Sequence, residues 1–215
     1  AGFLAPEAAR TAAADIASAN WHATAALAGR AVDRALLVDI GSTTADLIPI
    51  VQGLPAATGY SDAERLETGE LVYSGVVRTP LVALCTHAPF GGRSTALMAE
   101  YFATTADVHR LCGSLPPTVD LQPSADGRGK SLAESAARLA RMVGDDAEPA
   151  DAEAIYALAA HLATVQRRRL REAVQRVEQG RAGRRRCIVG AGIGRFLIRQ
   201  VAAEAGWRYV DFAEA

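Results

Sequence analysis

Cysteine, lysine and long apolar runs are all scarce in this chain of 215 residues. The three cysteines, Cys85, Cys112 and Cys187, lie far apart and form no CxxC pair. This pattern argues against a disulfide framework and against a cysteine zinc site. No apolar run reaches the roughly 18 residues that a membrane span needs. We therefore expect a cytoplasmic protein with neither a membrane segment nor a signal peptide.

Charge is nearly balanced, with 23 basic and 24 acidic residues and a net charge of -1. This balance gives no electrostatic reason to expect nucleic acid or an anionic membrane as a partner. Lys130 is the only lysine, and we attribute the excess of arginine to a GC-rich coding sequence. The run Arg167–Arg171 resembles a nucleic-acid patch, but acidic residues share its expected helix, so a solvated helix face is the better interpretation. The sequence leaves homo-oligomer formation open.

Strand-like and helix-like segments alternate along the chain, which predicts an α/β fold. We expect strands at residues 34–40, 45–51, 92–98, 186–189 and 207–212, and helices within residues 6–30, 101–111, 131–143, 151–179 and 195–205. Glycine and proline interrupt residues 53–80 and 115–129, which we interpret as loops. The chain begins at Ala1 without methionine and enters helix-like sequence at once, so we expect an N-terminal segment to be missing.

The strongest chemical signal is the segment from Val38 to Asp46, a buried strand that runs into a polar turn. Asp39 stands near the end of the strand, where a carboxylate can hold a hydrated Mg²⁺. Gly41 would let a phosphate approach backbone N–H groups, and hydroxyl donors follow it. These donors are Ser42, Thr43 and Thr44. The alternative is an ordinary β-hairpin with a polar turn.

A second signal is a strand, a glycine-rich turn and a helix from Cys187 to Leu197. Gly190, Gly192 and Gly194 would let a ligand meet the backbone and the helix N-terminus. The GxGxG spacing is not that of a dinucleotide fingerprint, and too little chain follows for a Rossmann domain. A close-packed turn between strand and helix is the alternative to ligand contact.

Together the two signals resemble the acetate and sugar kinase/Hsp70/actin superfamily, in which both segments face a phosphate. Further segments, at residues 18–21, 71–80 and 99–107, resemble its hydantoinase/oxoprolinase-related branch, and within it the synthases of methanofuran and methylofuran biosynthesis. The resemblance implies an actin/ribonuclease H-like fold of two lobes. It covers residues 1–215 as one domain, and the first phosphate hairpin of the superfamily is not in this chain.

In those synthases a furan that carries an aminomethyl group and a diphosphate ester is joined to a phenol oxygen. Diphosphate leaves, and no nucleotide is consumed. The resemblance thus implies an aryl-ether-forming transferase that acts on a furan diphosphate and a phenolic amine of the tyramine or tyrosine type, with Mg²⁺ as cofactor. Two other functions stay open. One is an ATP-dependent kinase or hydantoinase/oxoprolinase-type hydrolase, and the other is a non-enzymatic nucleotide-binding switch.

The resemblance also assigns roles to individual residues. Asp39 would position Mg²⁺, residues 41–44 would bind the diphosphate, and Asp46 would order the hairpin or the metal shell. Ser74 and Arg78 would line the substrate cleft. Arg78 is then a diphosphate partner, for which a surface ion pair is the alternative.

The base that takes the phenol proton is harder to assign. Glu100 and Asp107 lie in a resembling segment and are both candidates. A structural role at the start of a helix is the alternative for each. Asn20 and Trp21 either touch substrate or serve as a helix cap and a buried packing group.

Overall fold

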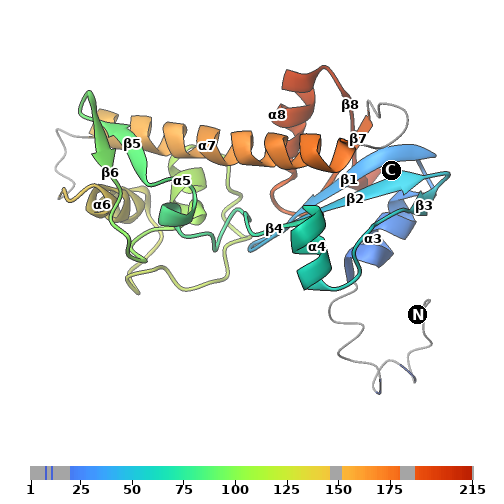
Figure 1. Cartoon of the computed structure of the whole chain (residues 1–215). Helices are drawn as coiled ribbons and strands as arrows, with labels where there is room; N and C mark the ends of the chain where they lie inside the picture. Colours follow the sequence, from blue (N-terminus) through green and yellow to red (C-terminus); the bar gives the residue numbers. More distant parts are fainter. Residues whose placement is uncertain (1–7, 9–10, 12–19, 146–151, 180–186, 215) are drawn as a thin grey trace.

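The computed structural model of this chain describes residues 8, 11, 20–145, 152–179 and 187–214. Within these residues the elements form two groups joined by the long helix α7 (Figure 1). The first group, here called the sheet region, contains α3 (Asn20–Ala28), β1 (Arg34–Ile40), β2 (Ala45–Val51), β3 (Leu54–Pro55), α4 (Asp62–Thr68), β4 (Leu71–Val72), β7 (Cys187–Ala191), α8 (Arg195–Ala205), β8 (Arg208–Asp211) and the 3₁₀ turn η3 (Phe212–Glu214). The second group, the helical region, contains the 3₁₀ turn η1 (Leu81–Ala83), β5 (His87–Phe90), β6 (Arg93–Ala96), α5 (Thr105–Leu111), α6 (Leu132–Met142) and the first half of α7 (Ala152–Glu178).

The main sheet is mixed and has six strands among the described residues. Its order is β3-β2-β1-β7-β8, and β4 also pairs with β2. β1 pairs antiparallel with β2, which brings Asp39 opposite Asp46. On its other side β1 pairs parallel with β7, which brings Asp39 opposite Ala191. The predicted α/β class is therefore confirmed.

Helices cover both faces of the sheet, and this explains why β1 is apolar at almost every position. Leu36, Val38 and Ile40 belong to a core with α8 and the second half of α7. The alternate residues Ala35 and Leu37 belong to a separate core that includes α3. Because a strand with two buried faces has fixed side-chain directions, the position of Asp39 at its end is well defined.

Helix α7 contributes to the cores of both regions. Ile155 and Leu162, in its first half, pack in the core of the helical region. Leu170 and Val177, in its second half, pack against the sheet. Gln166 is fully buried between these two apolar stretches. The two regions are thus joined by one continuous helix with a polar residue near the junction.

The expectation of a loop over residues 53–80 is wrong in part, because α4 and two short strands lie there. The Ser61 side chain accepts a hydrogen bond from the Glu64 backbone N–H, and the Glu64 side chain bonds back, which forms a capping box. Gly69, at a φ of 78°, ends the helix. Likewise α5 begins four residues later than expected, because Thr104 is its N-cap.

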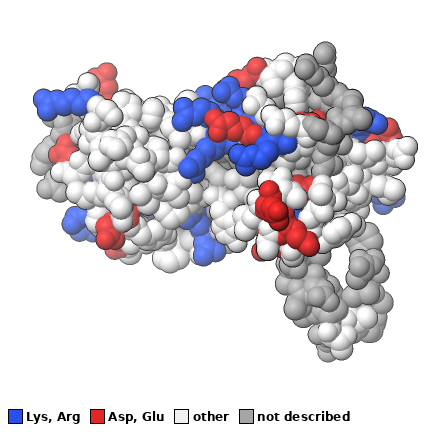
Figure 2. Space-filling view, viewed as in Figure 1, with Lys and Arg blue, Asp and Glu red and all other residues white. Residues whose placement is uncertain are grey.

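Basic side chains gather with acidic ones over the middle of α7 (Figure 2). Arg167 and Arg171 both pair with Glu204 of α8, at 2.7 and 3.5 Å. Arg168 lies 3.8 Å from Glu172 one turn along the helix. These pairs agree with a solvated helix face. In the described part of the chain, each helix is too short or too polar to cross a bilayer.

Candidate functional site

A carboxyl group without a partner lies at the C-terminal end of β1. Asp39 is half-buried and makes no hydrogen bond or ion pair with the residues that the structure describes. Burial, and to a smaller extent the charge of Asp46 across the strand pair, raises the pKa of Asp39 to about 6. Such a carboxyl at the C-terminal end of a strand is typical of a functional site.

Asp46, by contrast, is held by an arginine that the sequence analysis did not single out. Arg65 of α4 is buried, and its Nη2 lies 2.7 Å from Asp46 Oδ1 and 3.1 Å from the Glu70 carbonyl oxygen. Its guanidinium carbon lies 4.3 Å from the centre of the Trp21 ring. Burial raises the pKa of Asp46, and Arg65 acts against that rise. Asp46 therefore joins the hairpin to α4, and Trp21 packs against Arg65, whereas the role of either residue toward a ligand stays a prediction.

The turn of the hairpin, residues 41–44, is bound by neighbouring chain on one side only. Four backbone N–H groups of residues 75–78 donate to carbonyl oxygens of residues 41–43, at distances between 2.8 and 3.1 Å. The N–H groups of Ser42, Thr43 and Thr44 donate to none of the described residues. A row of unused donors on a tight turn can bind an anion such as a phosphate.

Two glycines show which side of this turn is open. A side-chain carbon built on Gly75 would lie between 2.3 and 2.4 Å from backbone atoms of Ser42 and Thr43, so that side is filled. A side-chain carbon built on Gly41 would meet only the Thr44 carbonyl oxygen, at 3.8 Å. The fold does not need glycine at position 41 for space, and the open side is where a ligand can approach.

The glycine-rich turn after β7 lies directly against the hairpin. The Gly194 N–H donates to the Ile40 carbonyl oxygen at 2.9 Å, and a side-chain carbon on Gly192 would lie 2.4 Å from Asp39 Oδ1. At all three positions, Gly190, Gly192 and Gly194, such a carbon would lie between 2.2 and 2.5 Å from the nearest protein atom. Close packing therefore accounts for these glycines, and their contact with a ligand stays a prediction.

Arg78 and Ser74, on the segment that binds the turn, differ in exposure. Arg78 is exposed, and its Nη1 lies 3.5 Å from Thr43 Oγ1, so its guanidinium lies beside the turn, and its contact with diphosphate stays a prediction. Ser74 is 1% exposed, and its Oγ accepts a hydrogen bond from Gln166 Nε2 at 3.2 Å. The expectation that Ser74 lines an open cleft is therefore corrected, because its side chain supports the turn from the interior.

A buried polar network holds the segment behind the turn. The Gly75 carbonyl oxygen accepts hydrogen bonds from Gln166 Nε2 at 2.9 Å, Thr105 Oγ1 at 2.9 Å and Thr79 Oγ1 at 3.1 Å. Gln166 Oε1 lies 2.7 Å from His109 Nε2, which must carry the proton because the amide oxygen only accepts. Burial lowers the pKa of His109 to about 4, against the effect of its bond to Gln166. The sequence analysis missed this network, since Gln166 lies 57 or more positions from each of its partners.

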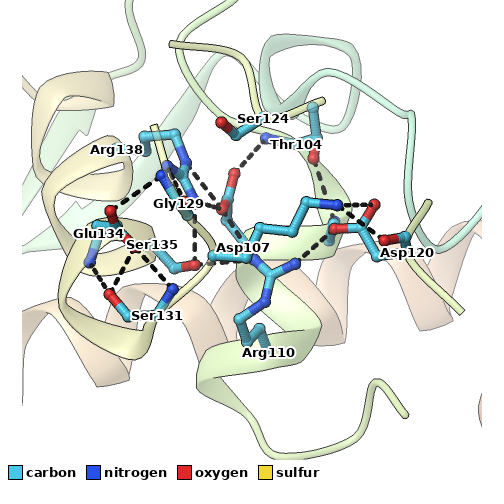
Figure 3. A network of polar contacts seen from close by, with 12 residues as sticks. Thr104, Asp107, Arg110, Asp120, Ser124, Gly129, Ser131, Glu134, Ser135 and Arg138 are labelled. Carbon is cyan, nitrogen blue, oxygen red and sulfur yellow. Dashed lines mark hydrogen bonds and ion pairs between the residues drawn. The ribbon is translucent and has the colours of Figure 1, made fainter. Parts of the chain in front are cut away.

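Asp107 is a structural residue in this arrangement (Figure 3). Its carboxylate accepts the Thr104 backbone N–H at 3.1 Å and pairs with Arg138 at 2.7 Å and with Arg110 at 3.2 Å. It is 3% exposed, which agrees with the interpretation as a helix-start residue, and its role as a phenol base stays a prediction. Glu100 is exposed on a bend before α5, and its role as a base stays a prediction.

Asp39 is the carboxylate of this site that fits a magnesium ion shared with a phosphate. In the described residues, no three His, Cys, Asp or Glu side chains gather as a metal site built from protein alone requires. Mg²⁺ is commonly held by one or two carboxylates together with phosphate and water oxygens. Asp39 offers a carboxylate without a partner, whereas Arg65 already occupies Asp46.

Comparison with known families gives a match over nearly the whole chain. The sequence model described as hydantoinase/oxoprolinase covers residues 2–214. The match therefore includes the hairpin, the glycine-rich turn after β7, and the helical region between them.

Two curated relatives share one name, (4-{4-[2-(gamma-L-glutamylamino)ethyl]phenoxymethyl}furan-2-yl)methanamine synthase. The protein of Methanocaldococcus jannaschii is 36% identical over 147 residues, which are 68% of this chain and 44% of that protein. The protein of Methanococcus vannielii is 37% identical over 111 residues, which are 52% of this chain and 50% of that protein. The chain thus spans about half the length of the curated relatives that it matches.

Proposed function

We propose that this chain, which belongs to the hydantoinase/oxoprolinase family, is an aryl-ether-forming transferase of methanofuran or methylofuran biosynthesis. Its substrates would be an aminomethyl-furfuryl diphosphate and a phenolic amine. The printed name of the two relatives supports this proposal, because it describes a furan methanamine linked through a methylene to a phenoxy oxygen.

The observation that carries the proposal is the open side of the hairpin turn. Three backbone N–H groups without acceptors among the described residues, at Ser42, Thr43 and Thr44, lie where Gly41 leaves room. Arg78 adds a guanidinium within 3.5 Å of Thr43. Backbone donors and an arginine are the groups that bind diphosphate in proteins.

The reaction needs little from the protein beyond binding and alignment. The phenol oxygen bonds to the methylene carbon of the furan while the bond from that carbon to the diphosphate oxygen breaks. Diphosphate leaves with the electron pair, and the phenol proton passes to a base, for which Glu100 and Asp107 are the candidates. The furan oxygen stabilises positive charge on the methylene carbon. The protein would neutralise the leaving group, align the phenol and exclude water.

Asp39 would hold the Mg²⁺ that accompanies the diphosphate, and this ion would neutralise charge on the leaving group. The turn from Gly41 to Thr44 would bind the diphosphate oxygens. Arg65 would keep Asp46, and with it β2, in a fixed position. We also propose that the sheet region and the helical region correspond to the two lobes of an actin-like fold, with the diphosphate bound beside the hairpin.

The test is diphosphate release from a furfuryl diphosphate in the presence of Mg²⁺ and a phenolic amine. We expect release to depend on the phenol and the ether product to form. Asp39→Ala should lower this rate by about 100-fold or more, because it removes the carboxylate that positions charge at the leaving group. Asp33→Ala, which removes an exposed carboxyl just before β1, is the matched control and should keep the wild-type rate.

Two outcomes of the enzyme assays would overturn the proposal, and a third comes from nucleotide binding. One is a wild-type rate of ether formation in Asp39→Ala, with unchanged circular dichroism. The other is phosphate release from ATP with no ether formed, which would place the chain among the kinases or hydrolases of the same fold. Reversible nucleotide binding without any turnover would favour a switch protein instead.

A further inference from the structure

The hydrogen bonds behind the hairpin turn form continuous series that end at its open side. They pass through Gln166, which is fully buried in the middle of α7. Its Oε1 accepts from His109 Nε2 at 2.7 Å, and its Nε2 donates to the carbonyl oxygens of Gly75, at 2.9 Å, and Ser74, at 3.3 Å. The amide thus accepts from α5 and donates toward the segment that holds the turn.

The geometry of the peptide bond passes this direction on to the turn. The described residues contain no cis peptide, so each carbonyl oxygen points away from the N–H of the next residue. The Gly75 carbonyl oxygen faces Gln166. On the other side of that peptide, the Val76 N–H donates to the Gly41 carbonyl oxygen at 3.1 Å. Since the Gly41 carbonyl shares its peptide with the Ser42 N–H, that N–H points away from Val76 and toward the open side.

A second series of the same kind reaches Thr44. It begins with the longer bond from Gln166 to the Ser74 carbonyl oxygen. On the other side of that peptide, the Gly75 N–H donates to the Thr43 carbonyl oxygen at 2.9 Å. The Thr43 carbonyl shares its peptide with the Thr44 N–H, which consequently points to the open side as well.

The third N–H group of the turn, at Thr43, is oriented without Gln166. The Ser42 carbonyl oxygen, which belongs to the same peptide, accepts the N–H groups of Val77 and Arg78, at 3.1 and 2.8 Å. A change at position 166 leaves these two bonds in place. Thr43 therefore serves as an internal reference for the other two N–H groups.

Bonds that follow one another in this way strengthen one another, because each donor polarises the group that it binds. The Gln166 amide and the peptides behind the turn all donate in the same direction, toward Ser42 and Thr44. Their dipoles add positive potential at these two N–H groups, where the proposed diphosphate carries its charge. The amide lies in the protein interior, where electrostatic effects are weakened least by water.

We infer that Gln166 is a positioning residue of the diphosphate site, which orients and polarises the N–H groups of Ser42 and Thr44 through the intervening peptides. The inference rests on the proposed function for the identity of the anion. Gln166 is fully buried and acts only through these peptides. Its loss therefore weakens diphosphate binding without removing any group that contacts the ligand.

Calorimetry with inorganic diphosphate and Mg²⁺ tests this role on the full chain. We expect Gln166→Leu to bind diphosphate about tenfold more weakly, because two hydrogen bonds to a charged ligand lose strength and alignment. Val177→Ala is the control for stability, since it opens a cavity at a buried position about three turns along the same helix. It should lower the unfolding temperature by a similar amount and keep the wild-type affinity.

Amide proton shifts in ¹H–¹⁵N NMR spectra distinguish positioning from a general loosening of the turn. Saturating diphosphate should move the signals of Ser42, Thr43 and Thr44 downfield, since each N–H then bonds to a charged oxygen. In Gln166→Leu this change should shrink at Ser42 and Thr44 and persist at Thr43. A merely structural residue would affect all three signals alike.

Thr105 offers an independent pair of variants, because it binds the same carbonyl oxygen as Gln166. Its buried Oγ1 donates to the Gly75 carbonyl oxygen at 2.9 Å. Thr105→Val has nearly the same shape but lacks the donor, so it should weaken diphosphate binding about threefold. Thr105→Ser keeps the donor and should retain most of the affinity. This pair tests the role even where Gln166→Leu does not fold.

Several results would contradict the positioning role. They are wild-type diphosphate affinity in folded Gln166→Leu, an equal loss in Val177→Ala, equal losses of shift at all three N–H groups, and equal affinity of the two Thr105 variants. A wild-type chain that binds no diphosphate would disprove the proposed site together with this role. A chain that shows the predicted pattern of binding but forms no ether would disprove only the reaction.

Discussion

The proposed function of Asp39 and its surroundings favour different protonation states of its carboxyl group. The proposed role requires the charged form, which attracts Mg²⁺, whereas burial and Asp46 favour the neutral form. A bound cation would resolve this conflict, because it stabilises the ionised carboxylate. Without a cation, the charge of Asp39 lowers the stability of the folded chain at neutral pH.

This conflict predicts a pH-dependent effect of Asp39→Asn. The folded-state pKa of about 6 lies above the ordinary value of 3.8, so the folded chain holds the proton more tightly. Stability of the wild type therefore falls as pH rises from about 4 through 6. Asn removes that loss, and in Mg²⁺-free buffer the variant should be more stable at pH 7.5. We expect on the order of 1 kcal/mol, reduced from the full shift by partial solvent contact.

Urea unfolding at pH 7.5 and at pH 4 measures this difference. The advantage of Asp39→Asn should vanish at pH 4, where the wild-type carboxyl is protonated in the folded state. Asp33→Asn controls for the loss of one charge near the same strand. A variant that is less stable than the wild type at pH 7.5 would contradict a strained carboxyl at position 39.

Among the elements, the hairpin turn is held from one side and open on the other. Gly41 and Gly194 both belong to glycine-containing turns, and neither has a φ in the left-handed region. They differ in the room that each leaves for a side chain, because a side-chain carbon on Gly194 would lie 2.5 Å from Ile40 Cγ2. Alanine at each of the two positions therefore distinguishes an effect on packing, expected at Gly194, from an effect on ligand binding, expected at Gly41.

We predict that Gly41→Ala folds normally and gains up to about 0.5–1 kcal/mol, because alanine restricts the unfolded chain. It should nevertheless bind inorganic diphosphate, with Mg²⁺ present, at least about tenfold more weakly, since its methyl group occupies the open side. Gly194→Ala should cost about 1–3 kcal/mol through overpacking. Thermal unfolding and calorimetry report the two effects. Unchanged diphosphate affinity in Gly41→Ala would place the ligand elsewhere.

Most of the regular elements and the hairpin could be predicted from the sequence, because apolar runs and helix caps are local signals. It did not reveal α4, although the pattern Ser61-x-x-Glu64 is a capping box, because nearby glycines and a proline suggested loop. Arg65 was missed with that helix. The base candidate Asp107 was placed correctly at the start of a helix, but only the fold brings Arg138 to it, 31 positions away.

At the scale of the whole molecule, one helix and one buried amide join the two regions. Gln166 contacts Ser74, Gly75 and His109, so it connects the segment behind the hairpin turn to α5. These contacts depend on residues that are remote in sequence. Sequence periodicity can predict that position 166 lies on the buried face of α7, but it cannot identify the partners of the side chain. The hydrogen bonds that support the turn were therefore found only in the structure.

We predict that Gln166→Leu lowers the free energy of unfolding by about 2 kcal/mol. Leucine fills a similar volume but leaves the His109 N–H and the Ser74 side chain without their partner. Gln175→Leu on the exposed face of the same helix is the matched control and should change stability by no more than about 0.5 kcal/mol. Equal stability of the two variants in urea unfolding would show that the buried network contributes nothing.

His109 gives this junction a further property. With a pKa near 4, its ring stays uncharged throughout the range in which enzymes are usually assayed. The link between the regions is therefore insensitive to moderate acidification, and this histidine adds no inflection near neutrality to a pH–rate curve. An inflection near pH 6 can accordingly be attributed to Asp39 without subtracting a contribution from this imidazole.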